Sequence, residues 1–454
     1  MVNSTASVAA PPTWFTASED HPVRHGNSAK AFLDGDGYYA DLAASIRAAA
    51  GVDSVVAFAS WDLRTDFALV PGDDSSTLVR LLTDASARGV TIRALLNRHQ
   101  ANPFTSGTIT GYDNTDAAAF IDSLPTGVAL HDDRYLVAGT HHQKIAVVST
   151  PSGLVAYSGG MDLNPDRLTT GATRCKHDVQ VRLTGPVAVD HYEVLAARWA
   201  DHPGSEPFPG LPPAHETDAA GPLAAQLVTT YGNGTARAGI APAGYDFAPT
   251  GDQSLGDLVL GAIEQARSFI YLEDQYLVNP AVSAALIAAL PRLERLVILI
   301  ADTPAISKEL IQAWRRRRAF VLPLIKAAPG KVSVCVGTRL FVHSKLWIFD
   351  DELAVIGSAN ANRRGYTHDS EQAVGIVDTE RGAWVQDLRV ALWAKHLGLP
   401  PELLRDPLTA AAHWFAIPAQ ADVDPYDPSA GADRPAFPRG TDYFWHTLID
   451  PDGS

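Results

Sequence analysis

The chain has 454 residues, 46% of them hydrophobic and 19% charged, with a formal net charge of -15 at pH 7. This is the composition of a globular protein and excludes a disordered one. The negative charge argues against a protein that coats nucleic acid, because such binding depends on Lys and Arg meeting phosphates. We therefore expect no nucleic-acid partner. Two cysteines, Cys175 and Cys335, are too few for a disulfide framework.

No targeting segment is visible. The first residues lack the basic region and the apolar core of a signal peptide. No stretch approaches the roughly 20 continuous apolar residues of a membrane span. We therefore expect a cytoplasmic protein, or a secreted one if a leader has been removed. The oligomeric state is left open, with a monomer favoured.

The first half of the chain alternates helices with short apolar strands. In chain order, we expect a helix over 39–50, a strand over 54–59 leading to Trp61, a helix over 76–88, and strands over 90–96, after Lys144 and over 178–183.

The second half repeats this order. We expect a helix over 255–267, a strand over 269–272, a helix over 281–289, and strands over 295–300, after Lys345 and over 372–377. Such alternation is typical of α/β proteins. We predict an α/β fold of two similar halves related by a pseudo-two-fold axis. Each half has a mixed sheet flanked by helices, and one active site lies at their interface.

Composition divides the chain into four parts. Residues 1–202 form the N-terminal half and residues 223–399 the C-terminal half. The Pro-rich segment 203–222 is predicted to be a linker between them. Residues 400–454 are rich in Pro and Asp and are expected to pack on the fold as a tail, with one short helix near Glu402–Phe415.

The pattern His-x-Lys occurs twice and nowhere else, at His142-Gln143-Lys144 and at His343-Ser344-Lys345. Each pair opens an apolar run that leads into a Gly-rich turn. Alternation along a strand puts residues i and i+2 on one face. Each motif therefore presents an imidazole and an ammonium side by side at the end of a buried strand.

Two imidazoles and two lysines suit attack on a phosphodiester. Neutral imidazole approaches an anion more readily than a carboxylate does, and covalent catalysis divides one difficult step into two. A second, protonated imidazole donates to the leaving oxygen and later deprotonates the incoming water or alcohol. The lysines offset charge on the non-bridging oxygens. We find no Cys/His metal spacing, P-loop or Rossmann glycines, and so expect no metal and no cofactor.

The second half carries the fuller signature, because the motif at His343 is followed by Asp350, Gly357-Ser358-x-Asn360 and Glu371. This arrangement resembles the phospholipase D superfamily, in its eukaryote-like and bacterial phospholipase D branch, and the resemblance covers most of the chain. It implies that both halves are phospholipase D-like and that Asp350 is mainly a structural group at a strand end.

The first half departs from this pattern. Ser149 replaces the strand-end Asp, and Gly159 stands 17 residues after His142, where the second half has Asn360. A Gly-Gly-x-Asp version, here ending at Asp162, occurs in the eukaryote-like branch of the family. We therefore expect phosphate binding to rest mainly on Asn360.

The resemblance implies catalysis through a phosphohistidine. The N-terminal His of the family is most often the nucleophile, so we assign His142 as nucleophile and His343 as general acid/base, with the reverse assignment kept open. Each imidazole needs a carboxylate on its other nitrogen. Glu371 is expected to pair with His343, and Asp178, at the matching place of the first half, with His142.

Four further residues are candidates for substrate binding. The Ser358 hydroxyl either contacts substrate or only shapes its turn. Gly159, at the first-half position equivalent to Asn360, is a further candidate. Trp61 and Tyr276 stand where family members line the mouth of the site, although aromatic core packing explains them equally well.

The predicted function is hydrolysis or transphosphatidylation of glycerophospholipids, with possible peripheral membrane contact. The alternatives are a nuclease, a cardiolipin- or phosphatidylserine-synthase-like transferase, and an enzyme for a soluble phosphodiester. The negative charge argues against a nuclease, and the absence of visible membrane spans argues against a synthase-like transferase. A non-catalytic phosphate-binding scaffold is the remote alternative, because His and Lys are intact in both motifs.

Overall fold

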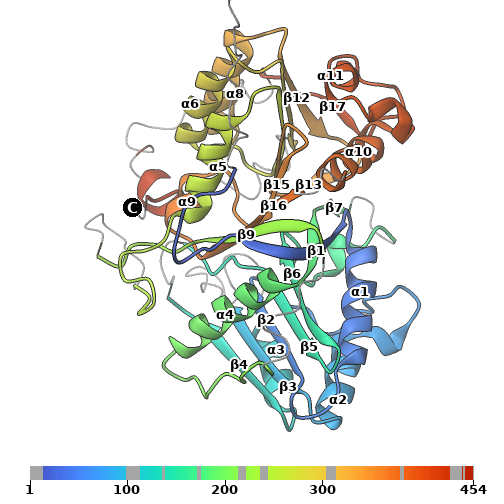
Figure 1. Ribbon diagram of the computed structural model, residues 1–454, viewed down its shortest axis with the longest axis vertical. Helices are drawn as coiled ribbons and strands as arrows, with labels where there is room; N and C mark the ends of the chain where they lie inside the picture. The colour runs from blue at the N-terminus through green and yellow to red at the C-terminus, as the bar shows by residue number, and fades with distance from the viewer. Residues whose placement is uncertain are drawn as a thin grey trace, which may run out of the picture.

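The computed structural model describes residues 14–98, 113–134, 139–170, 175–212, 221–235, 244–302, 313–378, 383–429, 442 and 445–452. It is a mixed α/β fold, as predicted. Figure 1 shows the N-terminal half, in blue to green, below the C-terminal half, in yellow to red, with strands β1 and β9 side by side where the halves meet.

Within the described residues, the two halves build one continuous 15-stranded sheet. The strands of the first half are β1 (Arg24–Phe32), β2 (Val55–Ser60), β3 (Thr91–Asn97), β4 (Gly127–Asp132), β5 (Ile145–Thr150), β6 (Gly153–Gly159) and β8 (Gln180–Thr184). Those of the second half are β9 (Leu223–Thr230), β10 (Phe269–Asp274), β11 (Arg295–Ala301), β12 (Val332–Gly337), β14 (Leu346–Phe349), β15 (Leu353–Gly357), β16 (Glu371–Asp378) and β17 (Val423–Pro425).

The strand order repeats. Outward from the junction, the first half runs β1-β8-β6-β5-β2-β3-β4 and the second half runs β9-β16-β15-β14-β10-β11-β12. In each half the three strands farthest from the junction in these series are parallel and the others pair antiparallel. This is the mixed sheet that we expected, twice over. The rotation axis between the halves stays a prediction.

Helices cover both faces of the sheet. They are α1 (Gly35–Ala48), α2 (Leu78–Ala87), α3 (Thr115–Asp122), α4 (Pro186–Ala200), α5 (Ser254–Gln265), α6 (Pro280–Ala289), α8 (Ala313–Ala327), α9 (Arg363–Thr367), α10 (Trp384–Leu397), α11 (Pro407–Ala410) and α12 (Ala412–Phe415). The buried apolar positions of α2 follow the spacing of one helical face: Leu78, Leu81, Leu82 and Ala85.

The strands are buried on both sides because their alternate residues enter different cores. Val55 and Ala57 of β2 join a core that includes α4 and α10 and continues into the second half. Val56 and Phe58 of the same strand face α1 and α2, and α5, α6 and α8 build the matching core of the second half. Near-continuous apolar strands are typical of such three-layer arrangements.

Two short pairings join the halves beside the sheet. Strand β7 (Lys176–His177) pairs in parallel with β13 (Phe341–Val342). A parallel bridge links His141 to Ser370. Each pairing sets the segment before one His-x-Lys motif against a segment of the opposite half.

The C-terminal segment departs from the predicted single helix near Glu402–Phe415. It forms a 3-10 turn (Pro401–Leu404), then α11 and α12. Pro407, which has no backbone N–H to continue a helix, begins the second piece. None of the described helices combines the length and apolar composition that a bilayer crossing requires.

Candidate active site

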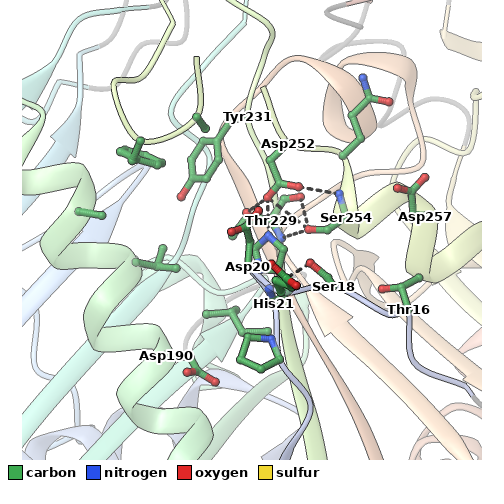
Figure 2. Close-up of a pocket in the computed structure, with 18 of the residues that line it drawn as sticks. Thr16, Ser18, Asp20, His21, Asp190, Thr229, Tyr231, Asp252, Ser254 and Asp257 are labelled. Carbon is green, nitrogen blue, oxygen red and sulfur yellow. Dashed lines mark hydrogen bonds and ion pairs between the residues drawn. The ribbon is translucent and has the colours of Figure 1, made fainter. Parts of the chain in front are cut away.

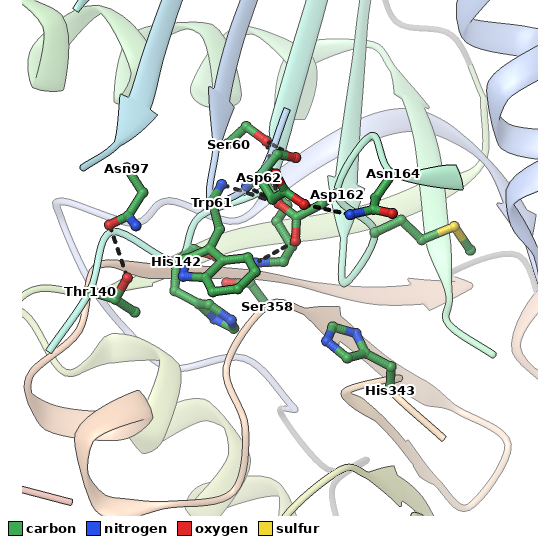
Figure 3. Close-up of polar contacts among 12 residues, drawn as sticks. Ser60, Trp61, Asp62, Asn97, Thr140, His142, Asp162, Asn164, His343 and Ser358 are labelled. Atoms are coloured by element: carbon green, nitrogen blue, oxygen red, sulfur yellow. Dashed lines mark hydrogen bonds and ion pairs between the residues drawn. The ribbon is translucent and has the colours of Figure 1, made fainter. Parts of the chain in front are cut away.

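Both His-x-Lys motifs lie where the two halves meet. His142 comes just before β5 and His343 just before β14, the corresponding strand of the other half. Figure 3 shows the two imidazoles in one view of this junction, with Trp61 and Asp162 beside His142. The motifs also share one electrostatic environment. The ammonium of Lys345 lowers the pKa of His142, and that of Lys144 lowers the pKa of His343.

The carboxylate partners are exchanged between the halves, which corrects the predicted pairing. Nδ1 of His142 lies 2.9 Å from both oxygens of Glu371, and Nδ1 of His343 lies 2.6 Å from Oδ2 of Asp178. We expected each acid to serve the histidine of its own half. Instead, each imidazole takes its carboxylate from the opposite half.

The bridges between the halves explain this exchange. The His142 N–H donates to the carbonyl of Ser370 (2.9 Å), the residue before Glu371. In the same way the His343 N–H donates to the carbonyl of His177 (2.8 Å), the residue before Asp178. Each histidine is therefore anchored by its backbone to the segment that supplies its carboxylate.

The His142–Glu371 pair is almost closed to solvent. The His142 side chain is 13% exposed and that of Glu371 is 1% exposed. Burial, with the charges of Lys144 and Lys345, holds the pKa of His142 well below its usual range. Burial raises the pKa of Glu371 to about 7. Both effects favour the neutral imidazole of His142, which is the form that a nucleophile needs.

The His343–Asp178 pair has a more cationic setting. Burial, followed by Lys345 and Arg167, holds the pKa of His343 well below its usual range, and burial raises that of Asp178. Arg167 Nη2 lies 3.4 Å and Lys345 Nζ 3.0 Å from Nδ1. The Asp178 contact is the shortest of the three, so we assign the Nδ1 proton to that hydrogen bond.

Both lysines are held beside their histidines by polar contacts. Lys144 Nζ donates to the His142 carbonyl (3.0 Å) and lies 3.3 Å from Oδ2 of Asp162. Lys345 Nζ donates to the His343 carbonyl, and burial lowers its pKa to about 8. Both ammonium groups are thus available to offset phosphate charge at the junction.

Gly159 is not the counterpart of Asn360, which corrects a second prediction. The β5–β6 hairpin is longer than β14–β15, because Gly159 lies 15 residues after Lys144 whereas Gly357 lies 12 residues after Lys345. Strand pairing aligns Gly159 with Gly357. The residue three positions farther on is Asp162 in the first half and Asn360 in the second.

This alignment gives the two halves different polar groups at equivalent places. Although burial alone would raise the pKa of Asp162, Lys144 and Arg167 lower it. Asn360 is 6% exposed, and its Oδ1 has no hydrogen-bond partner among the described residues. Because the two ends of an amide can be exchanged by rotation, Asn360 can offer a donor to a phosphate oxygen.

The structure places the remaining candidates differently. Ser358 is fully buried, and its hydroxyl contacts Glu371 and Gln372, which favours its role in shaping the turn. Its contact with substrate stays a prediction. The Trp61 ring meets the His142 ring edge-on, with centroids 6.2 Å apart. Tyr276 is half-buried, and its carbonyl accepts from Arg317. The roles of Trp61 and Tyr276 in substrate binding stay predictions.

Three site residues were missed at the sequence level. Arg167 is 3% exposed and lies beside both His343 and Asp178. The Gln372 amide donates to the carbonyls of Lys144 (3.1 Å) and Gly159 (3.3 Å), so it ties the second half to the first. Asp162 was noted only as part of a motif. The Gly-Gly-x-Asp sequence was the one available signal for it.

One group of described residues could in principle hold a metal ion. His177, Glu273 and His396 place one ligand atom each within 4.8 Å of the others, and all three are buried. This group contacts the Ser344 side chain, which points to the opposite side of its strand from those of His343 and Lys345.

A cavity of about 790 Å³ lies elsewhere. It opens between residues 16–24, α4 and residues 247–257 (Figure 2). His21 and Ser254 bind Asp252 inside it, and Arg24 pairs with Asp190 at its edge. The cavity contains no residue of either His-x-Lys motif, so the chemistry belongs to the junction and not to this space.

Comparison with known proteins matches residues 259–393 to the family described as "Cardiolipin synthase, PLD-like domain". The chain is 24% identical over 513 aligned residues to phospholipase D alpha 1 of Carica papaya, covering 76% of this chain and 62% of that protein. It is 23% identical over 486 residues to phospholipase D alpha 1 of Nicotiana tabacum, covering 76% and 57%. The chain thus spans less than two thirds of these relatives.

Among solved structures, the fold is similar to a phosphatidylserine synthase of Haemophilus influenzae Rd KW20. The TM-score is 0.59 with 13% sequence identity, and the match covers 86% of this chain and 93% of that one. At this identity the likeness concerns the fold alone.

Proposed function

The chain belongs to the phospholipase D superfamily, and on this premise we propose that it cleaves phosphodiesters through a phosphohistidine. The observation that carries the proposal is the pair of imidazole–carboxylate contacts at one junction, His142 with Glu371 and His343 with Asp178. In both pairs Nδ1 contacts the carboxylate. Nε2 is then the nitrogen left to act on a phosphorus or an oxygen.

In the first step, Nε2 of His142 attacks phosphorus and the bond from phosphorus to the leaving oxygen breaks. The imidazolium of His343 donates its Nε2 proton to that oxygen. Lys144, Lys345 and Asn360 take the charge on the non-bridging oxygens. The anionic substrate itself raises the pKa of His343 in the complex, because it adds a negative charge beside the imidazole.

In the second step, neutral His343 removes a proton from water or an alcohol. The resulting oxygen nucleophile attacks phosphorus, the phosphorus–nitrogen bond breaks, and His142 is released as the neutral imidazole. Water gives hydrolysis and an alcohol gives transfer. The two outcomes use the same residues and differ only in the acceptor.

The substrate class that we propose is a glycerophospholipid, in line with the phospholipase D relatives. A second candidate is phosphatidyl transfer to a specific alcohol, because the family matched over residues 259–393 is described by a synthase. The purified protein should be assayed against phosphatidylcholine, phosphatidylethanolamine and single-stranded DNA, with and without chelator. We expect chelator-resistant release of phosphatidic acid, and a phosphatidyl alcohol when ethanol is added.

The control for this assay is the variant with both His142 and His343 changed to Ala, which should release nothing. Cleavage of DNA without cleavage of lipid would replace the substrate class and leave the mechanism. Loss of all activity in chelator, restored by a divalent ion, would contradict the proposed charge compensation by lysine.

Histidine variants separate nucleophile from acid. His142→Ala should form no phosphoenzyme. His343→Ala should still be labelled slowly by a nitrophenyl phosphodiester, whose leaving group needs no proton, since acid assistance is worth about 10²–10⁴-fold. The adduct should then persist, because His343 also activates water. The measurement is mass spectrometry of the labelled peptide. An adduct on His343 in the His142→Ala protein would reverse the two roles.

A further inference from the structure

The middle residue of each His-x-Lys motif turns away from the catalytic side. Alternation sends His and Lys to one face and the residue between them to the other. Ser344 and Gln143 are both fully buried, and both enter polar clusters. These two clusters lie behind the active site, where the proposed mechanism uses no residue.

Behind His343, the cluster centres on Glu273 at the end of β10. Its carboxylate accepts from His177 Nε2 (2.8 Å), His396 Nε2 (3.0 Å), the Tyr271 hydroxyl (2.6 Å) and the Ser344 hydroxyl. We call these five residues the Glu273 cluster. Although burial alone would raise the pKa of Glu273, the two imidazoles hold it well below its usual range. The carboxylate is therefore ionised, with four donors for its four lone-pair positions.

Glu273 accepts hydrogen bonds from both chain segments that form the His343–Asp178 pair. Ser344 stands between His343 and Lys345. His177 directly precedes Asp178, and its carbonyl accepts the His343 N–H. Through these two contacts, Glu273 fixes the imidazole relative to the carboxylate that comes from the opposite half.

The first half has a matching cluster built from different residues. Arg198 of α4 donates to Gln143 (2.6 Å), Ser370 (3.0 Å) and Asp132. Gln143 is the middle residue of the motif, as Ser344 is. Ser370 precedes Glu371 as His177 precedes Asp178. The donating guanidinium of Arg198 therefore corresponds to the accepting carboxylate of Glu273. Each connects the middle residue of one motif to the residue before a catalytic carboxylate.

We propose that Glu273 and Arg198 are positioning residues, each of which sets one catalytic imidazole against the carboxylate of the opposite half. This deepens the proposed function and rests on it. The repeat supports the assignment, because two unrelated sets of residues make the same connection. A misplacement of about 1 Å at a reacting group can cost about 100-fold in rate. Loss of one of these buried contacts should therefore lower kcat.

The Glu273 cluster also contains the three residues that could hold a metal. Its contacts of 2.8 and 3.0 Å from imidazole nitrogen to carboxylate oxygen are hydrogen-bond distances. The carboxylate already accepts from Tyr271 and Ser344 as well. We therefore assign protons, and not a cation, to this cluster.

The test compares Ser344→Ala with Ser333→Ala in the full-length protein. Ser333, on β12, is also buried, and its hydroxyl donates to the Trp414 carbonyl at a distance from both motifs. Each variant loses one buried hydroxyl. We expect Ser344→Ala to lower kcat about 10- to 100-fold with KM unchanged, Ser333→Ala to keep kcat, and Ser344→Thr, which retains the hydroxyl, to recover most of it.

A second readout needs no substrate. The His343 Nδ1 proton bound to Asp178 should give a far-downfield NMR signal in protein labelled with ¹⁵N-histidine. The signal should broaden by faster exchange in Ser344→Ala and in Glu273→Gln, but not in Ser333→Ala. If wild-type protein cleaves no phosphodiester, the proposed function fails, and this signal still tests the positioning role. Equal kcat and an unchanged signal in Ser344→Ala, or one tightly bound metal ion per chain that His396→Gln removes, would overturn the inference.

Discussion

The partner of Nδ1 decides what each histidine can do. A carboxylate that accepts the Nδ1 proton leaves the lone pair of neutral His142 on Nε2, where a nucleophile needs it. If Glu371 is protonated, it donates to Nδ1 instead and the proton of the ring moves to Nε2. The protonation state of Glu371 therefore controls whether His142 can attack.

This coupling predicts a bell-shaped dependence of kcat/KM on pH. Burial raises the pKa of Glu371 to about 7, so kcat/KM should fall as the pH drops through that value. Burial lowers the pKa of Lys345 to about 8, so kcat/KM should fall again as the pH rises through it and the ammonium is lost. The profile of kcat/KM reports groups of the free enzyme, and a soluble nitrophenyl phosphodiester avoids pH effects on a lipid surface.

Two variants assign the limbs of this profile. Glu371→Gln keeps an acceptor for Nδ1 but cannot titrate, so the acidic limb should disappear from its reduced activity. Lys345→Arg keeps its charge at high pH and should lose the alkaline limb. An acidic limb that survives in Glu371→Gln would belong to another group, and the link from Glu371 to the nucleophile would be wrong.

At this scale the sequence predicted the histidines and lysines of the site but not their partners. The His-x-Lys spacing alone places an imidazole and an ammonium on one strand face. The choice between Glu371 and Asp178 for each imidazole depends on the bridges from β7 to β13 and from His141 to Ser370. These pairings are one or two residues long, too short to leave a periodic pattern.

Elements were predicted well where apolar periodicity extends over a whole strand or helix. The expected strand over 295–300 is observed as Arg295–Ala301, and the helix over 281–289 as Pro280–Ala289. The lengths of the two hairpins could not be predicted, so the first-half equivalent of Asn360 was placed wrongly. Counting residues from His142 pointed to Gly159, because a count along the chain carries no information about the extra residues in β5 and β6.

Gly159 lies where strands β6 and β8 approach closely at the site. Its φ is +155°, and a Cβ there would lie 2.4 Å from the Val179 carbonyl oxygen. Gly153, in the same hairpin, has φ +139° with nothing within 4 Å of a Cβ. Both Gly→Ala changes meet the conformational cost of a positive φ, roughly 1–3 kcal/mol, but only Gly159→Ala adds a clash with backbone.

We therefore expect Gly159→Ala to lower the free energy of unfolding by about 1–3 kcal/mol more than Gly153→Ala, the usual cost of overpacking. Gly159→Ala should also reduce activity, because its carbonyl accepts from Gln372 and the clash would move it. Urea unfolding of both variants measures the difference. Equal destabilisation would mean that β6 and β8 can separate at this point without cost.

For the whole molecule, the sequence predicted two similar halves but not the way they join. The repeated strand order follows from the repeated order of motifs and apolar runs. The antiparallel pairing of β1 with β9, which makes one sheet of the two, has no local signal. It joins two strand edges that are far apart in the sequence, each of which would otherwise be left unpaired at the end of its half-sheet.

This architecture predicts that the chain can be cut between the halves and still assemble. A cut between residues 216 and 217 lies in the predicted linker, outside the described residues. The β1–β9 pairing, the two imidazole–carboxylate pairs and the Arg198–Ser370 contact all cross the junction without this segment. Fragments 1–216 and 217–454, expressed together, should copurify and recover most of the activity, because these contacts across the junction offset the entropy lost when two separate chains associate.

Either fragment alone should be inactive and form no phosphoenzyme, because each histidine would lack its carboxylate. The matched control is the same pair of fragments with Glu371→Gln in the second one. It should assemble equally well, as judged by size-exclusion chromatography, but label poorly on His142. If the fragment with His142 were labelled without its partner, the nucleophile would need no carboxylate from the opposite half, and the exchange of acids would be structural and not catalytic.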